Sequence, residues 1–276
     1  MTRQINPKSK SGRRSPGRRM LLGLLAALTL AVPAKAARTV PVQIDGTALD
    51  AVCHLENGVT YVPLRALLDT LGGWDVSWDS AKRAAVAVSG DSCLTADPAA
   101  DTVTVDGEAR SGRVYVQEGV TYVPLRTAAE LLGCAVEWDA YFQGAAVTSG
   151  SAEHNAVDFY WLSRIISAES RGEPMEGQIA VGNVVLERVA SEDFPDNIPD
   201  VVFQQAGGIV QFEPVENGTV YLEPTDQSVE AARRTLRGEK SLEGAMFFYA
   251  PALSEGVWIN GNRTYLTTIG CHRFYL

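Results

Sequence analysis

The sequence predicts an α+β protein made of two unlike parts. Residues 40–149 contain a strand-rich duplication, because GVTYVPLR occurs at residues 58–65 and again at 119–126. The chain after residue 157 lacks this repeat and has two segments with helical apolar stripes, followed by aromatic-rich segments typical of strands. The length of 276 residues, 46% of them hydrophobic, is enough for one or two globular cores.

The first 36 residues have the composition of a secretory signal peptide. Seven Lys and Arg residues precede the apolar run MLLGLLAALTLAV, no acid occurs before Asp45, and residues 34–36 (AKA) offer the small side chains that a signal peptidase reads. An uncleaved N-terminal anchor is the alternative, because Lys35 lies inside the cleavage region. In both cases we expect the working part of the protein outside the cytoplasm.

The charge of the exported part excludes polyanionic partners. Loss of residues 1–36 removes eight basic residues and leaves 16 Lys and Arg against 33 Asp and Glu, a net charge near −17. A chain this acidic repels nucleic acid and anionic lipid surfaces. We therefore expect no nucleic-acid partner.

The cysteines and histidines do not form a metal-binding pattern. The four cysteines have no CxxC spacing, and only three histidines are present, so we expect no structural zinc site and no cofactor. Export permits disulfides, and Cys53 with Cys93 is the favoured pair, but free thiols are an equal alternative for all four cysteines. The four cysteines are Cys53, Cys93, Cys134 and Cys271.

Each copy of the duplication is predicted to fold as a ββαββ unit. The offset between copies is 61 residues, and VQIDG at 42–46 aligns with VTVDG at 103–107. GVTYVP alternates as a strand does, and Pro63 or Pro124 suits the first turn of the amphipathic helix that follows. The shared residues are apolar or turn-forming, which indicates packing rather than catalysis.

This duplicated segment resembles the copper amine oxidase N-terminal-like stalk domain of bacterial wall-associated proteins. The resemblance depends on residues 62–65 and 123–126 and on the Trp-Asp pairs at 78–79 and 138–139. It implies a spacer or envelope-attachment role, with envelope or spore-coat proteins as partners. Copper is not implied, because the segment has a single histidine. Residues 150–157 are small and polar and are expected to be a linker to a second domain at 158–276.

Glu169 is the candidate catalytic residue of the second domain. The segment 158–170 (DFYWLSRIISAES) is predicted to be a helix, and the apolar spacing from Leu162 through Ile165 and Ile166 places Glu169 on its buried face, just before Gly172. Burial and the negative end of the helix dipole both raise the pKa of a carboxyl group, which suits a general acid. The alternative is a solvated carboxylate at a helix end.

The remaining elements are predicted from periodicity and turn residues. We expect a helix over 175–191 and a strand hairpin over 210–224 around Asn217-Gly218. An amphipathic surface helix follows over 225–239, and strands follow at 245–251 and 263–276.

The second domain resembles the cell wall hydrolase family of the spore cortex-lytic enzymes (SleB and CwlJ type). The residues that carry the resemblance run in family order: RIISAESRGEP (164–174), EGQIAVGNVVLERV (176–189), FP (194–195), VQFEPV (210–215), FFYAP (247–251) and IGCHRFY (269–275). The resemblance implies a lysozyme-like α+β domain that cleaves the glycan strands of peptidoglycan with Glu169 as general acid/base. Three positions depart from the family, which usually has Asn where this chain has Glu187, Ala250 and Cys271. Ala250 and Cys271 are expected to flank the groove, where they could alter substrate contacts.

The resemblance implies a lytic transglycosylase, for which one acid suffices. Glu169 would protonate the glycosidic oxygen between N-acetylmuramic acid and N-acetylglucosamine, and its conjugate base would then accept the proton of the muramic C6 hydroxyl, giving a 1,6-anhydro product. Hydrolysis is the alternative and needs a second carboxylate. Glu213 is the better candidate because strand periodicity puts it on the side of Gln211, whereas Glu173 is expected to be a solvated loop residue. A non-catalytic glycan-binding or coat-assembly protein is a third possibility.

Several further residues are expected to position the substrate. Gln211, Tyr249 and His272 are candidates for polar contacts, although His272 could equally be a hydrogen-bonded core residue. Phe212 and Trp258 could stack on sugars, with core packing as the alternative. The sequence leaves open whether the substrate is the spore cortex or the vegetative wall.

Overall fold

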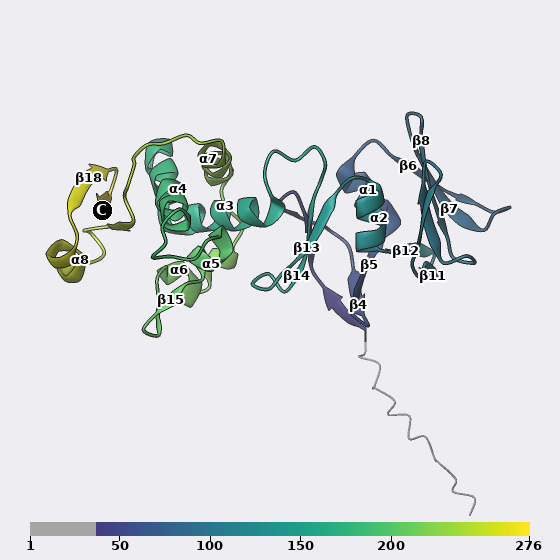
Figure 1. The fold of residues 1–276 in the computed structure, drawn as a ribbon, viewed down its shortest axis with the longest axis horizontal. Helices are drawn as coiled ribbons and strands as arrows, with labels where there is room; N and C mark the ends of the chain where they lie inside the picture. The colour runs from purple at the N-terminus through teal and green to yellow at the C-terminus, as the bar shows by residue number, and fades with distance from the viewer. Residues whose placement is uncertain (1–36) are drawn as a thin grey trace, which may run out of the picture. The chain divides into compact units, whose positions relative to one another are not determined.

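The computed structural model describes residues 37–276, so the predicted signal peptide lies outside the described residues (Figure 1). Within this range, none of the helices combines the length and the apolar character that crossing a bilayer requires.

The duplicated segment folds as two copies of a unit that has more strands before its helix than the predicted ββαββ order, and one further strand, β8 (Ser92–Asp97), lies between the copies in sequence. Copy one consists of β1 (Arg38–Val40), β2 (Val42–Ile44), β3 (Thr47–Ala48), β4 (Cys53–Glu56), β5 (Val59–Pro63), α1 (Leu64–Leu71), β6 (Asp75–Asp79) and β7 (Ala84–Ser89). Copy two consists of β9 (Thr102–Val105), β10 (Glu108–Ser111), β11 (Tyr115–Gln117), β12 (Val120–Pro124), α2 (Leu125–Leu131), β13 (Ala135–Asp139) and β14 (Gly144–Thr148).

The two copies are joined at equivalent strands. β5 pairs antiparallel with β12, and Val62 lies opposite Val123, its own counterpart 61 residues later. This register gives the copies an approximate local two-fold relation. They also exchange strands, because β2 of copy one pairs with β14 of copy two, whereas β9 of copy two reaches β7 of copy one through β8. Apolar side chains from both copies therefore form one core.

The second part of the chain is built around three packed helices. α3 (Ala156–Ser170), α4 (Met175–Val189) and α7 (Asp226–Leu236) confirm the helices expected there. The Asn155 side chain caps α3 by accepting hydrogen bonds from the backbone N–H groups of Val157 and Asp158. At Gly182 on α4, an added Cβ would lie 2.9 Å from Ile166 Cδ1 and 2.8 Å from Thr235 Oγ1, so the glycine lets the three helices approach closely.

The predicted hairpin over 210–224 is wrong. This segment forms α6 (Glu213–Glu216) and the 3-10 helix η1 (Thr219–Tyr221). Pro214 lies in the first turn of α6, where its fixed φ and missing N–H suit a helix and oppose a strand. The other short elements before it are α5 (Ile198–Val202), β15 (Gln205–Ala206) and β16 (Ile209–Val210).

The chain ends in a small antiparallel sheet of order β17-β19-β18. β17 (Phe247–Tyr249), β18 (Tyr265–Ile269) and β19 (His272–Tyr275) confirm the aromatic-rich strands, and α8 (Val257–Asn262) lies between β17 and β18 in sequence. Phe274 of β19 is fully buried in the core of the helices, so the sheet packs on them.

The turn between β13 and β14 contacts α3 and α5. Trp161 Nε1 donates a buried hydrogen bond to Asp139 Oδ2 (2.7 Å), and Tyr141 Oη donates one to Asp200 Oδ1 (2.7 Å). The Tyr141 ring also stacks on Phe203, with 4.0 Å between ring centroids. The expected linker, segment 150–157, therefore connects two parts of the chain that contact one another directly through the β13–β14 turn, α3 and α5.

Candidate active site

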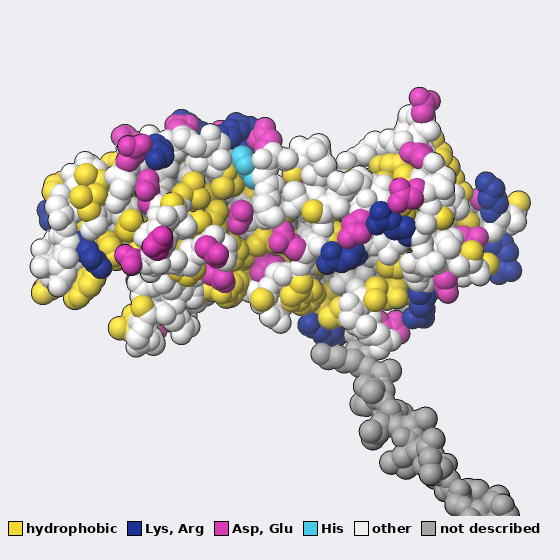
Figure 2. All heavy atoms as spheres, viewed as in Figure 1, with side chains coloured by type: hydrophobic (Ala, Val, Ile, Leu, Met, Phe, Trp, Pro, Cys, Tyr) yellow, Lys and Arg dark blue, Asp and Glu magenta, His cyan; other side chains and the backbone are white. Residues whose placement is uncertain are grey.

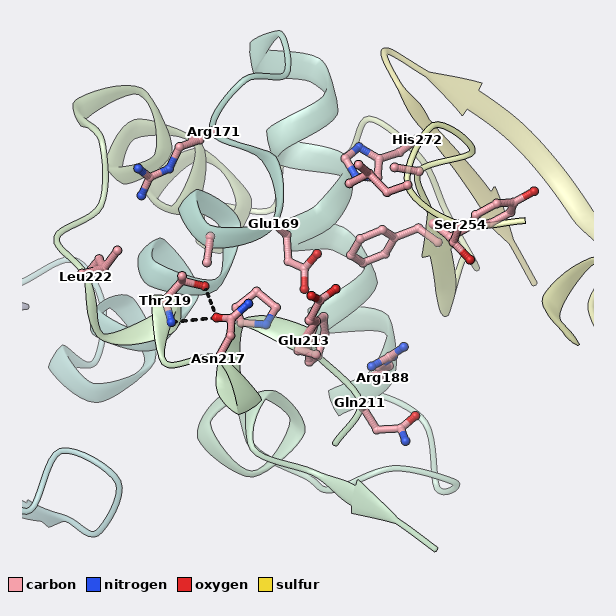
Figure 3. Close-up of a pocket in the computed structure, with 17 residues that line it drawn as sticks. Glu169, Arg171, Arg188, Gln211, Glu213, Asn217, Thr219, Leu222, Ser254 and His272 are labelled. Carbon is pink, nitrogen blue, oxygen red and sulfur yellow. Dashed lines mark hydrogen bonds between the residues drawn. The ribbon is translucent and has the colours of Figure 1, made fainter. Parts of the chain in front are cut away.

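A cleft of about 550 Å³ is lined by α3, α6 and the C-terminal sheet (Figure 3). It brings together the proposed acid and most of the residues expected to act with it, but not Trp258 or Glu173. The residues brought together are Glu169, Gln211, Phe212, Glu213, Tyr249 and His272.

Glu169 lies in the last turn of α3, half-buried, with its carboxyl group directed into the cleft (Figure 3). Burial raises its pKa from 4.5 to about 7, and the negative charge of Glu213 acts in the same direction. The positive charge of Arg188 opposes this rise. A substantial fraction of Glu169 is therefore protonated near neutral pH, as a general acid must be.

Glu213 is the first residue of α6, not a strand residue as predicted, and its side chain is exposed. Figure 3 shows its carboxylate and that of Glu169 pointing toward one another. The cleft thus contains two neighbouring carboxyl groups in different surroundings, one half-buried and one solvated.

Arg188 is a cleft residue that sequence reasoning missed. It is 4% exposed, its Nε donates to the carbonyl of Met246 (2.8 Å), and its guanidinium lies 4.9 Å from the ring centroid of Phe212. Burial lowers its pKa to about 10, so it remains a cation at neutral pH. In the sequence it resembles an ordinary basic residue in the last turn of a helix, and no signal distinguishes it.

Glu173 is not a solvated loop residue, and this expectation is corrected. Its side chain is 9% exposed, and its Oε2 accepts a hydrogen bond from Cys271 N (2.8 Å) while Oε1 lies 3.7 Å from His272 Nδ1. A Cβ at Gly270 would overlap this carboxylate. Glu173 is not among the residues that line the cleft; it holds the β18–β19 turn against the start of α4.

The other predicted residues differ in how far they face the cleft. Phe212 is 2% exposed and mainly packs in the core, and His272 is 7% exposed with its ring edge-on to Phe248 (5.4 Å). Tyr249 Oη accepts a hydrogen bond from Asn260 Nδ2 (3.0 Å). Trp258 is 59% exposed and lies outside the cleft.

The three positions that depart from the family pattern differ in where they lie relative to the cleft. Ala250 lines the cleft. Cys271 does not, although it was expected to flank the groove, because it lies in the exposed β18–β19 turn. Glu187 pairs with Lys240 at 3.5 Å, away from the cleft.

The described residues contain no cluster of side chains that could bind a metal ion, and no disulfide. Across residues 37–276, no three His, Cys, Asp or Glu side chains lie together as a group that could hold a metal ion. Cys53 and Cys93, the favoured pair, are free in the structure, as are Cys134 and Cys271. Burial raises the pKa of the Cys53 thiol to about 12, so it is not a reactive thiolate.

Known families match both parts of the chain. The copper amine oxidase N-terminal domain matches residues 43–147, and the cell wall hydrolase family matches residues 172–275. The cell wall hydrolase CwlJ of Oceanobacillus iheyensis is 30% identical over 105 residues, which cover 36% of this chain and 72% of that protein. The chain therefore belongs to the cell wall hydrolase family and carries a copper amine oxidase N-terminal-like domain before the hydrolase domain.

The chain is also similar to longer proteins and to a solved catalytic domain. The spore cortex-lytic enzyme of Bacillus subtilis is 32% identical over 130 residues, covering 47% of this chain and 40% of that enzyme. The chain spans less than half the length of the spore cortex-lytic enzymes that it matches. The catalytic domain of the germination-specific lytic transglycosylase SleB from Bacillus anthracis is 30% identical, with a TM-score of 0.40, over 45% of this chain and 98% of that domain.

Proposed function

We propose that the protein is an exported peptidoglycan-cleaving enzyme, a lytic transglycosylase in which Glu169 is the general acid and base. The observation that carries this proposal is the state of Glu169, a half-buried carboxyl group with a pKa of about 7 that faces a cleft of ligand-binding size. Membership of the cell wall hydrolase family supplies the substrate class, the glycan strands of peptidoglycan.

One carboxyl group can perform both proton transfers of this reaction. Protonated Glu169 donates its proton to the glycosidic oxygen between N-acetylmuramic acid and N-acetylglucosamine as the C1–O bond breaks. The resulting Glu169 carboxylate accepts the proton of the muramic C6 hydroxyl, whose oxygen bonds to C1. The sugar leaves as a 1,6-anhydro product, and Glu169 is again protonated.

In this mechanism Glu213 acts on Glu169 through its charge. A carboxylate beside Glu169 disfavours a second negative charge in the cleft and therefore keeps the proton on Glu169. The neighbouring cation Arg188 limits this effect, so the Glu169 pKa remains near neutrality, where proton donation and proton return are both accessible.

Hydrolysis is a second candidate, favoured by the presence of two carboxyl groups in one cleft. Glycosidases that hydrolyse the bond use one carboxyl group as acid and another as base or nucleophile. Glu213 is the second carboxyl group in that case, because Glu173 does not line the cleft.

The other cleft residues and the duplicated domain complete the proposal. Gln211, Tyr249 and His272 contribute polar groups that contact the sugar substituents, and the edge of Phe212 forms part of the cleft wall. We assign the duplicated domain to a spacer or attachment role that presents the hydrolase domain to its substrate in the spore cortex or the cell wall. A purely glycan-binding role would give no reason for the raised pKa of Glu169.

Product analysis separates the two reactions. Purified peptidoglycan is digested with the wild-type protein and with Glu213→Gln, and the released fragments are identified by mass spectrometry. Transglycosylation gives anhydro-muramic ends in both digests, because Glu213 transfers no proton and forms no bond in that reaction. Reducing muramic ends from the wild type, with loss of cleavage in Glu213→Gln, would replace this mechanism by hydrolysis. Absence of glycan cleavage by the wild type would refute the proposed enzyme activity.

A further inference from the structure

A second groove, of about 690 Å³, adjoins the catalytic cleft. Gln211 lines both, so the two cavities meet at this side chain. The groove lies within the size range of small-molecule sites, roughly 300–1,000 Å³. The lining residues that matter for its chemistry are Phe194, Gln204, Ile209, Phe247, Trp258 and Arg263.

One side of the groove presents aromatic rings and a cation. Trp258 is 59% exposed, and its ring lies edge-on to Phe247 with 6.3 Å between centroids. The guanidinium of Arg263 lies 4.1 Å from the Phe247 centroid and 5.4 Å from that of Trp258. Arg263 forms no ion pair with the acids of residues 37–276, including the exposed Asp193 that lines the same groove, so its charge is available to an anion.

One residue of the groove wall has a buried polar atom without a partner. Gln204 Oε1 is inaccessible to solvent and accepts no hydrogen bond from the described residues. A buried acceptor without a donor is costly, so a turn of the Gln204 amide that brings Oε1 to the groove surface, where a ligand N–H can donate to it, would be stabilising. Ile209, 71% exposed, adds apolar surface to the groove.

The exposed face of the molecule shows the same combination of side chains. Figure 2 shows hydrophobic side chains gathered together with Lys or Arg at the end of the molecule where Figure 1 places α8 and β18. Contiguous exposed apolar surface beside a cation is typical of a binding site.

We propose that this groove is a second saccharide site, which holds the same glycan strand beyond the bond that is cleaved. This inference rests on the proposed function, because it takes the occupant of the cleft to be peptidoglycan. The ligand class is an N-acetylated amino sugar that carries a carboxylate. Its apolar face stacks on Trp258, and its acetamido N–H donates to Gln204. Arg263 pairs with a carboxylate of the attached peptide or, where a muramic residue carries no peptide, with its lactyl carboxylate.

Binding without cleavage tests the site directly. The Glu169→Gln protein serves as the parent, and its affinity for purified insoluble peptidoglycan is measured by sedimentation. Adding Trp258→Ala is expected to weaken binding about tenfold, as truncation of a central aromatic anchor does. Adding Trp138→Ala is the matched control, because this tryptophan is also exposed (43%) but lies on β13 of the duplicated domain. Melting temperatures verify that each variant is folded.

The contribution of Arg263 is tested with probes that differ in charge. Arg263→Gln is expected to weaken binding to peptidoglycan but not to chitin oligosaccharides, which have acetamido groups and no carboxylate. Glycan strands freed of peptide separate the two anion sources. Removal of the peptide by an amidase frees the lactyl carboxylate, so weaker binding of Arg263→Gln to these strands shows that this group pairs with Arg263 where no peptide is attached. Unchanged binding assigns the partner to the peptide.

The second site is overturned if folded Trp258→Ala binds peptidoglycan as tightly as the parent, or if Trp138→Ala loses as much affinity. Failure of the proposed function looks different. In that case the wild type releases no fragments from peptidoglycan, whatever the affinities of these variants.

Discussion

Replacement of Glu169 by Gln is expected to stabilise the protein above pH 7 and to leave its stability almost unchanged below pH 4.5. Between these values, native Glu169 holds a proton that the unfolded chain has lost, because its pKa is about 7 in the fold and 4.5 otherwise. The wild-type stability contributed by the protonated group is therefore complete below pH 4.5 and is lost as the pH rises through about 7. Glutamine does not titrate, so the variant escapes this loss.

The size of the effect follows from the two pKa values. Each pH unit between them corresponds to about 1.4 kcal/mol, which gives about 3 kcal/mol as the upper limit of the gain at pH 8. The gain is smaller than this limit to the extent that water in the cleft solvates the carboxylate. For a protein of this size, about 1 kcal/mol shifts the melting temperature by about 2–4 °C, so the difference is measurable.

Thermal melting of both proteins from pH 4 to pH 9 measures this difference. The expected result is a gap in melting temperature that opens between pH 4.5 and 7 and is constant above. Glu216→Gln, at an exposed position of α6, is the control and should show no such gap. A gap between wild type and Glu169→Gln that is the same at all pH values would refute the raised pKa of Glu169.

Three further predictions follow from the contacts of the site and its support. The rate of peptidoglycan cleavage should fall as the pH rises, with the midpoint of the fall near pH 7. Glu213→Gln should move this midpoint to lower pH, because it removes a charge that raises the Glu169 pKa. Initial rates measured across pH test both expectations, and a midpoint that Glu213→Gln does not move contradicts the second. Asp139→Ala should cost about 1–3 kcal/mol in denaturant unfolding, because the buried Trp161 N–H loses its acceptor, and an unchanged midpoint would show that the bond contributes nothing. Gly270→Ala should lower both the melting temperature and the activity, because the added Cβ overlaps the Glu173 carboxylate and the backbone φ at Gly270 is +56°. Gly261→Ala is the control, because a Cβ there contacts no other atom, and it should not lower the melting temperature or the activity as much.

The local patterns of the sequence predicted the helix that carries the proposed catalytic residue. The spacing of Leu162, Ile165 and Ile166 gave the buried face of α3, and Glu169 lies where that spacing leads. The hairpin expected at 210–224 does not form, although apolar and polar residues alternate there, because Pro214 opposes a strand. A proline removes a strand hydrogen bond but fits the first turn of a helix, so it was the signal for α6.

The structural features that the sequence did not predict depend on contacts between segments far apart in the chain. The repeat predicted two equivalent units, but the exchange of β2 and β9 between them depends on which strand edges meet. Arg188 reaches the cleft because α4 packs beside α3, and Glu173 is buried because the β18–β19 turn, about 100 residues later, folds over it. Both contacts join segments that are far apart in the sequence, so local patterns do not predict them.

The most direct test of the account is the initial rate at which Glu169→Gln cleaves purified peptidoglycan at pH 6, compared with the wild type and Glu216→Gln. We predict a loss of at least about 100-fold for Glu169→Gln, as expected when a general acid is removed, and an unchanged rate for Glu216→Gln. Folded Glu169→Gln that releases the same products at the wild-type rate would contradict the assignment of Glu169 as the catalytic acid.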